Sequence, residues 1–317
     1  MLVFKDNQIY DKKIKNLCDY FQKDDVILFN KVKVIKAKLL GKISRNNSVI
    51  NINLDQEFDD IWQALCYPAK KIKKDDKIYF GEDFYAEVAD KLDNGFIKIK
   101  FNFSGEKFYL MLEKYGSIPL PPYIKRNIEN EEDLKNYQTI YAQDGCGVAA
   151  PTAGLHFTDD IFDKLKQKGV ICVYATLNVG AGTFLPVRSE FVKDHIMHSE
   201  KFILTQEVCD IINNAKRNHR KIIAVGTTSL RMLESAVNEF GEVEAMCKDT
   251  NIFIYPPYNF KIVDILMTNF HLPKSTLFML ICAFIGKENA FKIYEYAIKE
   301  KYRFYSYGDA SLLHLTQ

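Results

Sequence analysis

The chain has 317 residues and a formal net charge of +2 at pH 7, with 47% hydrophobic and 26% charged residues. This balance is ordinary for a globular protein, and the length suggests about two domains with a substantial core. The small net charge excludes a strong overall field for polyanions. A nucleic-acid partner therefore needs a local basic patch.

The N-terminal sequence and the cysteines predict a cytoplasmic protein. The first residues lack the charged and apolar regions of a secretory signal. The longest apolar run, residues 277–285, is too short to span a bilayer, so no membrane association is expected. The seven cysteines are scattered and include no Cys-x-x-Cys pair, which indicates free thiols in a reducing compartment.

The first part of the chain predicts two strands and then a series of short strands separated by turns. Strands are expected at residues 26–29 and 32–40. Beyond residue 40 come short strand-like runs separated by turn signals such as Asp93-Asn94-Gly95, which predict a small antiparallel barrel or sheet. The expected runs are residues 49–54, 77–80, 84–88, 96–103 and 108–112. We expect residues 41–116 to be an inserted β-barrel domain, because the flanking sequence has α/β character.

The second part of the chain alternates strands with helices. A stiff proline-rich connector, residues 119–123, leads into it. The alternation predicts helices packed on a mixed sheet, so residues 1–40 and 117–317 should form one discontinuous α/β domain. The expected strands are residues 170–177, 221–225, 252–255 and 262–267, and the expected helices are residues 207–218, 230–240, 276–285 and 288–299.

Residues 147–157 combine small residues, a proline and one histidine immediately before an amphipathic helix. Thr158 is expected as its N-cap, with two aspartates in the first turn and Gly169 at its end. His156 should therefore stand at the mouth of this helix, where it can carry a proton near neutral pH. The alternative is a simple turn with a hydrogen-bonded histidine.

Three further loops follow predicted strands, at residues 178–184, 226–229 and 268–275. In open α/β sheets, ligands bind outside the carboxyl ends of the strands. We therefore expect these loops to converge with residues 147–157 on one site. Arg231 could face a carboxylate or a phosphate there, although an exposed helical arginine is the commoner case. Asp309 lies in an aromatic turn where an unpaired carboxylate is costly, which favours a site residue.

Several common motifs are absent from the sequence. Gly180-Ala181-Gly182 lacks the third glycine and the following helix of a dinucleotide fingerprint, which argues against a Rossmann methyltransferase. His195 and His198 with Glu200 are only a weak signal for a metal. The sequence contains no nucleophile elbow and no P-loop.

Six stretches together resemble the S-adenosylmethionine:tRNA ribosyltransferase-isomerase family of queuosine biosynthesis, and the resemblance runs from about Asp19 to Leu313. They are residues 149–158, 179–184, 195–200, 225–231, 268–276 and 302–310. The resemblance implies transfer of the ribosyl part of S-adenosylmethionine to 7-aminomethyl-7-deazaguanine in a tRNA anticodon. Rearrangement then gives epoxyqueuosine-tRNA, with release of adenine and methionine. It also implies a monomer with a β-barrel inserted in an α/β domain, and no metal or cofactor beyond S-adenosylmethionine as substrate.

Within this resemblance we expect acid/base and charge-stabilising groups at His156, His271, Glu200 and Asp309. A sulfonium acidifies the adjacent ribose C5′ hydrogens, and adenine leaves better when a nitrogen is protonated. The glycine loops should admit the ribose and methionine parts, while Phe157, Phe184, Phe270 and Tyr307 should stack on a base. The expected substrate-binding residues are Thr152, Gly154, Phe157, Gly180, Gly182, Thr183, Phe184, Gly226, Thr227, Thr228, Ser229, Arg231, Asn269, Phe270, Lys274 and Tyr307.

The sequence departs from the family near its start. The family usually carries a further N-terminal segment, and its Asn-Asp-Thr-Arg-Val stretch is Asn30-Lys31-Val32-Lys33-Val34 here. The alternative is therefore an N-terminally shortened, non-catalytic tRNA-binding relative. Lys125 and Arg126 are the expected tRNA-binding residues. Further candidates are Lys70, Lys71, Lys73, Lys74, Arg217 and Arg220. A methyltransferase is the second alternative.

Overall fold

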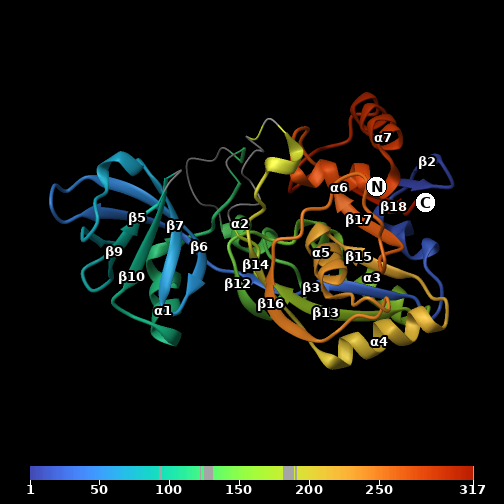
Figure 1. The fold of residues 1–317 in the computed structure, drawn as a ribbon, viewed down its shortest axis with the longest axis horizontal. Helices are drawn as coiled ribbons and strands as arrows, with labels where there is room; N and C mark the ends of the chain where they lie inside the picture. Colours follow the sequence, from blue (N-terminus) through green and yellow to red (C-terminus); the bar gives the residue numbers. More distant parts are fainter. Residues whose placement is uncertain (93–94, 122, 125–130, 181–188, 190, 317) are drawn as a thin grey trace.

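The computed structural model describes residues 1–92, 95–121, 123–124, 131–180, 189 and 191–316. The chain forms a nine-stranded mixed sheet covered by helices and a seven-stranded antiparallel sheet that closes into a barrel. Figure 1 shows the barrel at one end of the molecule and both chain termini at the other. This confirms the predicted α/β class with an antiparallel barrel.

The barrel is a ring of antiparallel strands with an apolar interior. The order is β5-β6-β7-β10-β9-β8, and β8 pairs back onto β5 to close the ring. Ile50, Ile52 and Leu54 point inward, following the period of two of a strand. The strands are β5 (Lys38–Ile43), β6 (Val49–Phe58), β7 (Ile61–Tyr67), β8 (Lys77–Tyr79), β9 (Tyr85–Lys91) and β10 (Phe96–Phe101).

The helix α1 (Gly105–Tyr115) replaces the strand expected at residues 108–112, so that prediction is wrong. Phe108 and Leu112 are buried against the barrel core and lie four residues apart, which is the spacing of one helix face. The short strand β11 (Gly116–Ser117) then pairs with β5 as the chain leaves the barrel.

Two other expected strands differ from the structure. Residues 32–40 are divided into β4 (Val32–Val34), which pairs with β12 (Asp144–Gly147), and β5 of the barrel. Polar and apolar residues alternate on both sides of the break, so the sequence does not reveal the change of sheet. Residues 252–255 form no strand, and the strand before them is β16 (Met246–Thr250).

The nine-stranded sheet is built around a parallel core. Its central strands, in spatial order, are β13 (Ile171–Leu177), β3 (Val26–Asn30), β15 (Ile222–Val225) and β17 (Ile265–Asn269). Further strands extend both edges. They are β14 (Glu200–Leu204) and β16 on the β13 side, and β18 (Ala310–His314), β1 (Leu2–Lys5) and β2 (Gln8–Asp11) on the β17 side.

Helices cover both faces of this sheet because successive residues of its strands point to opposite sides. Ile27 and Phe29 pack with α3 on one face, whereas Leu28 packs with α4, α5 and α6 on the other. No helix among the described residues is long and apolar enough to cross a membrane. The helices are α2 (Glu131–Asn136), α3 (Asp159–Gln167), α4 (Gln206–Arg217), α5 (Thr227–Ala236), α6 (Thr276–Ile285) and α7 (Lys287–Lys299).

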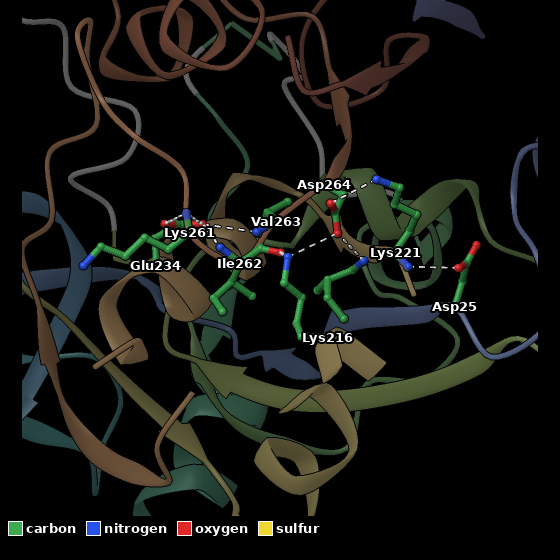
Figure 2. A network of polar contacts seen from close by, with 9 residues as sticks. Asp25, Lys216, Lys221, Glu234, Lys261, Ile262, Val263 and Asp264 are labelled. Atoms are coloured by element: carbon green, nitrogen blue, oxygen red, sulfur yellow. Dashed lines mark hydrogen bonds and ion pairs between the residues drawn. The ribbon is translucent and has the colours of Figure 1, made fainter. Parts of the chain in front are cut away.

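A polar network closes the amino ends of the central strands (Figure 2). Asp25, just before β3, accepts hydrogen bonds from the backbone N–H groups of Gln22 and Lys221 at 2.7 and 3.0 Å. Asp264, just before β17, accepts from the Ile222 N–H at 2.9 Å and from the Lys221 ammonium at 3.3 Å. These carboxylates therefore tie together the starts of β3, β15 and β17.

Glu234 on α5 belongs to the same network and is only 5% exposed. Its carboxylate accepts from the backbone N–H groups of Lys261, Ile262 and Val263 at 3.1 to 3.2 Å and from the Tyr258 hydroxyl at 3.2 Å. Buried carboxylates need such partners, because their desolvation is otherwise costly. Glu234 thus anchors the segment that leads into β17.

Candidate active site

A cavity of about 460 Å³ opens at the carboxyl ends of the central strands. Its wall includes Val179 after β13, residues 226–228 after β15 and residues 268–275 at the end of β17. Residues 150–153 and the pair Tyr305 and Ser306 complete the wall. This is the edge at which open parallel sheets bind ligands, because the loops diverge there.

Gly226 makes the sharp turn from β15 into α5. Its φ is +86°, in the region that favours glycine, and its N–H donates to the Met267 carbonyl at 2.8 Å. The helix therefore begins directly at the end of the strand. As a result, the first turn of α5 faces the cavity, and Thr227 and Thr228 line it.

A hydrogen-bonded chain leads from the cavity to His156. The Thr152 hydroxyl donates to Asn269 Oδ1 at 3.0 Å, and Asn269 Nδ2 lies 3.4 Å from His156 Nε2. With Asn269 oriented in this way, its amide donates to Nε2, which requires the ring proton on Nδ1. Burial lowers the pKa of His156, opposed by the charge of Asp309, so the ring is neutral at pH 7. Thr152 and Asn269 line the cavity, whereas His156 lies behind Asn269.

His271 is the histidine of the cavity wall. Its Nε2 is 2.9 Å from the Thr268 hydroxyl, and its backbone N–H donates to the Tyr294 hydroxyl at 3.0 Å. Burial lowers the pKa of His271 to about 4, so this imidazole is neutral at physiological pH. A neutral imidazole carries one donor and one acceptor, and both are useful for proton transfer.

Comparison with known proteins identifies the family of this chain. A family model described as "Queuosine biosynthesis protein" matches residues 1–313. The chain belongs to this family.

Three similar proteins match nearly the whole length of this chain. A Rickettsia bellii protein named S-adenosylmethionine:tRNA ribosyltransferase-isomerase is 46% identical, over 99% of this chain and 92% of its own. A Fusobacterium nucleatum protein of the same name is 47% identical, over 98% of this chain and 88% of its own. The crystal structure of S-adenosylmethionine tRNA ribosyltransferase from Thermotoga maritima is 30% identical, with a TM-score of 0.53 over 98% of this chain and 91% of that one. This coverage does not favour the shortened alternative.

Glu200 and Arg231 form a buried ion pair away from the larger cavity. The Arg231 guanidinium donates to the Glu200 carboxylate and, at 3.3 Å, to the Ile252 carbonyl. The Gly180 N–H donates to Glu200 Oε1 at 3.2 Å. Arg231 is 6% exposed and faces a carboxylate, as one of the two expected alternatives had it, but this carboxylate belongs to Glu200 and not to a ligand in the cavity. The pair ties α5 to β14 and to the loop after β13.

A smaller hollow of about 180 Å³ lies between the α/β part and the barrel. Gly180, His198, Ser199 and Glu200 border it from the α/β part. Asp55, Gln56, Phe58 and Gln63 border it from the barrel. Glu200 and Gly180 therefore face the boundary between the two parts, and neither lines the larger cavity.

Asp309 is held by a neighbouring arginine and lies outside the cavity wall. Its carboxylate accepts from the Arg303 backbone N–H at 2.8 Å and from the Arg303 guanidinium at 3.2 Å. Burial raises the pKa of Asp309, but the hydrogen bonds from Arg303 outweigh it and leave the pKa below its ordinary value. Asp309 is therefore an ionised, paired carboxylate.

The stacking role expected for Phe157 and Phe270 is contradicted by their positions. Phe157 is 2% exposed, and its ring centroid is 4.8 Å from that of Phe29 in the core. Phe270 belongs to the cavity wall, but its 1% exposed ring packs on Tyr294 and Phe304 at 5.5 and 5.1 Å. Both rings have no free face for a base.

Two aromatic rings at the cavity belong to tyrosines that were not among the expected site residues. Tyr123 and Tyr305 both line it, with ring centroids 4.4 Å apart. Tyr307, which was expected to stack on a base, packs edge-on against Tyr137 at 6.0 Å and does not belong to the wall. The signal was present, since Tyr305 is two residues from Tyr307 in the aromatic turn.

The remaining expected site residues fall into three groups. Gly226, Lys274 and the threonines 152, 227 and 228 line the cavity. Ser229 is fully buried behind it, and Gly154 is packed so closely that an added Cβ would lie 1.9 Å from the Tyr141 hydroxyl. The third group, Gly182, Thr183, Phe184, Lys125 and Arg126, lies outside the described residues.

Among the residues that the structure describes, no three His, Cys, Asp or Glu side chains are grouped to hold a metal.

Proposed function

We propose that this protein is an S-adenosylmethionine:tRNA ribosyltransferase-isomerase. It transfers the ribosyl part of S-adenosylmethionine to 7-aminomethyl-7-deazaguanine in tRNA and isomerises it, giving epoxyqueuosine-tRNA, adenine and methionine. The observation that carries this proposal is the full-length identity to proteins of that name, 46% over 99% of the chain.

The cavity supports this proposal by its size and its lining. Its volume of about 460 Å³ is within the usual range for small-molecule sites. The wall is mostly apolar, with hydroxyl, amide and imidazole groups at Thr152, Thr228, Asn269 and His271. Such a wall suits a substrate that has an apolar chain, a base and a few polar groups.

His271 is the residue that we propose to exchange a proton with S-adenosylmethionine. It lines the cavity and is neutral at pH 7, so it can accept a proton without first losing one. His156 acts through Asn269 as a positioning residue, because the amide lies between its ring and the cavity. Glu200 and Asp309 are also positioning residues, since each is already paired with an arginine.

The tRNA contacts are proposed on exposed lysines of the barrel. Lys70, Lys71, Lys73 and Lys74 are exposed at the turn between β7 and β8. Exposed lysines bind phosphate as point charges, so binding should weaken with salt. Arg217 is less suited because it pairs with Glu242 at 3.3 Å. We further propose a cytoplasmic monomer that needs no metal.

The decisive experiment measures adenine release from S-adenosylmethionine by the purified protein. The substrate tRNA carries 7-aminomethyl-7-deazaguanine, and the control tRNA carries guanine at the same position. We expect adenine only with the first tRNA, together with a nucleoside that has gained the mass of the epoxycyclopentane. If tRNA binds but no adenine appears, the non-catalytic alternative replaces this proposal. Transfer of a labelled methyl group instead would identify a methyltransferase.

A further inference from the structure

The amino end of α5 is a buried set of hydrogen-bond donors without acceptors in the described part of the chain. The backbone N–H groups of Thr227, Thr228 and Ser229 have no acceptor there. The side-chain hydroxyls of Thr228 and Ser229 are also buried without a described partner, and Thr228 is 9% exposed. Thr227 and Thr228 line the 460 Å³ cavity. Because buried donors are almost always paired, this end calls for an external acceptor.

Other helices of the protein meet this need within the chain. Helices α1, α3, α4 and α7 each carry an acidic residue in the first turn, which complements the positive end of the helix dipole. Helix α6 lacks one, but its N-cap Ser275 accepts from the Phe278 N–H at 3.1 Å. Helix α5 has neither an acidic residue in its first turn nor a side chain at its N-cap, which is Gly226.

The charged groups described on the cavity wall are limited to one cation. The wall of the cavity contains no aspartate or glutamate among the described residues. It does contain Lys274, whose ammonium forms no ion pair with a described residue. A helix amino end with free N–H groups, facing a cavity whose wall also carries a cation, forms a site for an anion.

We propose that the amino end of α5 binds the carboxylate of the methionine part of S-adenosylmethionine. This inference rests on the proposed function, which makes S-adenosylmethionine the ligand of the cavity. The carboxylate is the one anionic group of that substrate. It accepts from the first-turn N–H groups and the Thr228 hydroxyl, and Lys274 supplies the opposite charge.

The inference is tested by comparing S-adenosylmethionine with decarboxylated S-adenosylmethionine, which differs only in lacking that carboxylate. Dissociation constants are measured by calorimetry on the full chain. We expect the wild-type protein to bind the decarboxylated compound at least about 10-fold more weakly, as for the loss of charge-assisted hydrogen bonds.

The variants Thr228→Val and Lys274→Gln show which groups recognise the carboxylate. We expect each variant to weaken the binding of S-adenosylmethionine about 3- to 10-fold and that of the decarboxylated compound less than about 2-fold. The two effects differ because the substituted group and the carboxylate are in contact, and the effects of contacting groups are not additive. Unchanged binding of the second ligand also shows that a variant is folded. Thr205→Val is the matched control, since Thr205 is the N-cap of α4, away from the cavity, and makes no cap hydrogen bond. Lys287→Gln at the start of α7 is the control for Lys274.

Three outcomes separate the possible failures. If the wild-type protein binds both compounds equally, the carboxylate site is overturned while the proposed function stands. If the variants weaken only the binding of tRNA, the anion bound at this helix end is a phosphate, and the carboxylate assignment is again overturned. If the wild-type protein binds neither compound and releases no adenine, the proposed function fails and this inference fails with it.

Discussion

The two ends of the central parallel strands use hydrogen bonds in opposite ways. At the amino ends, Asp25, Asp264 and Glu234 accept from backbone N–H groups of neighbouring segments (Figure 2). At the carboxyl ends, the N–H groups and hydroxyls of the first turn of α5 have no described acceptor. The first end thus stabilises the fold, whereas the second leaves its donors available to a ligand. Loss of the acceptors at the first end should therefore reduce stability most, whereas loss of the polar groups at the second should reduce activity or binding most.

The largest effect is expected at the amino ends, for Glu234→Ala. This change leaves two buried N–H groups, one partly buried N–H group and the Tyr258 hydroxyl without their acceptor. We expect the free energy of unfolding to fall by about 4 kcal/mol, as for other broken buried charged networks. Urea denaturation measures it, with the exposed Glu239→Ala as control. A loss below about 1 kcal/mol would contradict the structural role of this end.

The next effect is expected at the carboxyl ends, for His271→Ala. We expect adenine release to fall about 100-fold or more, the usual contribution of a general acid or base. The free energy of unfolding should change much less than for Glu234→Ala. His219→Ala is the matched control because this histidine is exposed on the loop after α4. Retention of more than about half of the turnover would remove His271 from the catalytic residues.

A third test uses one buried histidine at each end. Burial lowers the pKa of both His271 and His314 to about 4, and His314 pairs with Ile265 at the start of β17. Unfolded histidines titrate near pH 6.5, so between about pH 6.5 and 4 the unfolded chain binds more protons. Stability should therefore be present at pH 7 and decrease as the pH falls through this range.

Between pH 7 and pH 5, one fully buried histidine with this shift accounts for about 2 kcal/mol, so the decrease should be about 3 kcal/mol in total after allowance for the partial exposure of His314. Urea midpoints at pH 7 and pH 5 measure it. His314→Gln should reduce the pH dependence without lowering adenine release at pH 7, because His314 lies away from the cavity. An unchanged pH dependence in this variant would show that His314 is not buried in its neutral form.

The smallest effect is expected for Gly226→Ala. An added Cβ would meet Thr228 Oγ1 at 3.5 Å and Ala153 Cβ at 3.7 Å, which are ordinary contacts. The cost then comes from the φ of +86° and should be about 1 kcal/mol of unfolding free energy. Gly241→Ala is the control, because it has a similar φ of +79° and open space around it. A much larger loss of unfolding free energy for Gly226→Ala alone would mean that the backbone of the turn into α5 cannot adjust to the added Cβ.

The cavity illustrates what the sequence can and cannot predict. Loops that follow predicted strands could be placed at one edge, because the rule for parallel sheets depends only on strand direction. The direction of single side chains could not be predicted in those loops. Asn269 reaches the cavity and the next residue, Phe270, packs into the core, although both belong to the same motif.

Long-range pairing explains the other differences. The strands β1 and β18 were not predicted, because each is short and they pair with each other from opposite ends of the chain. The sequence left two alternatives open for Arg231, a carboxylate or phosphate partner and an exposed position, because α5 alone does not reveal a partner from another element. In the structure its partner Glu200 comes from β14, and the carbonyl that accepts from it comes from residue 252.

The pairing of β5 with β11 has a consequence for how the barrel is attached. Leu39 lies opposite Gly116 and Lys38 opposite Ser117, so the chain enters and leaves the barrel through two adjacent antiparallel strands. Directly opposed residues of such strands have Cα atoms about 5 Å apart. The α/β part would therefore need only a tight turn to bypass the barrel. Replacing or removing the barrel would therefore leave the order of all other strands unchanged.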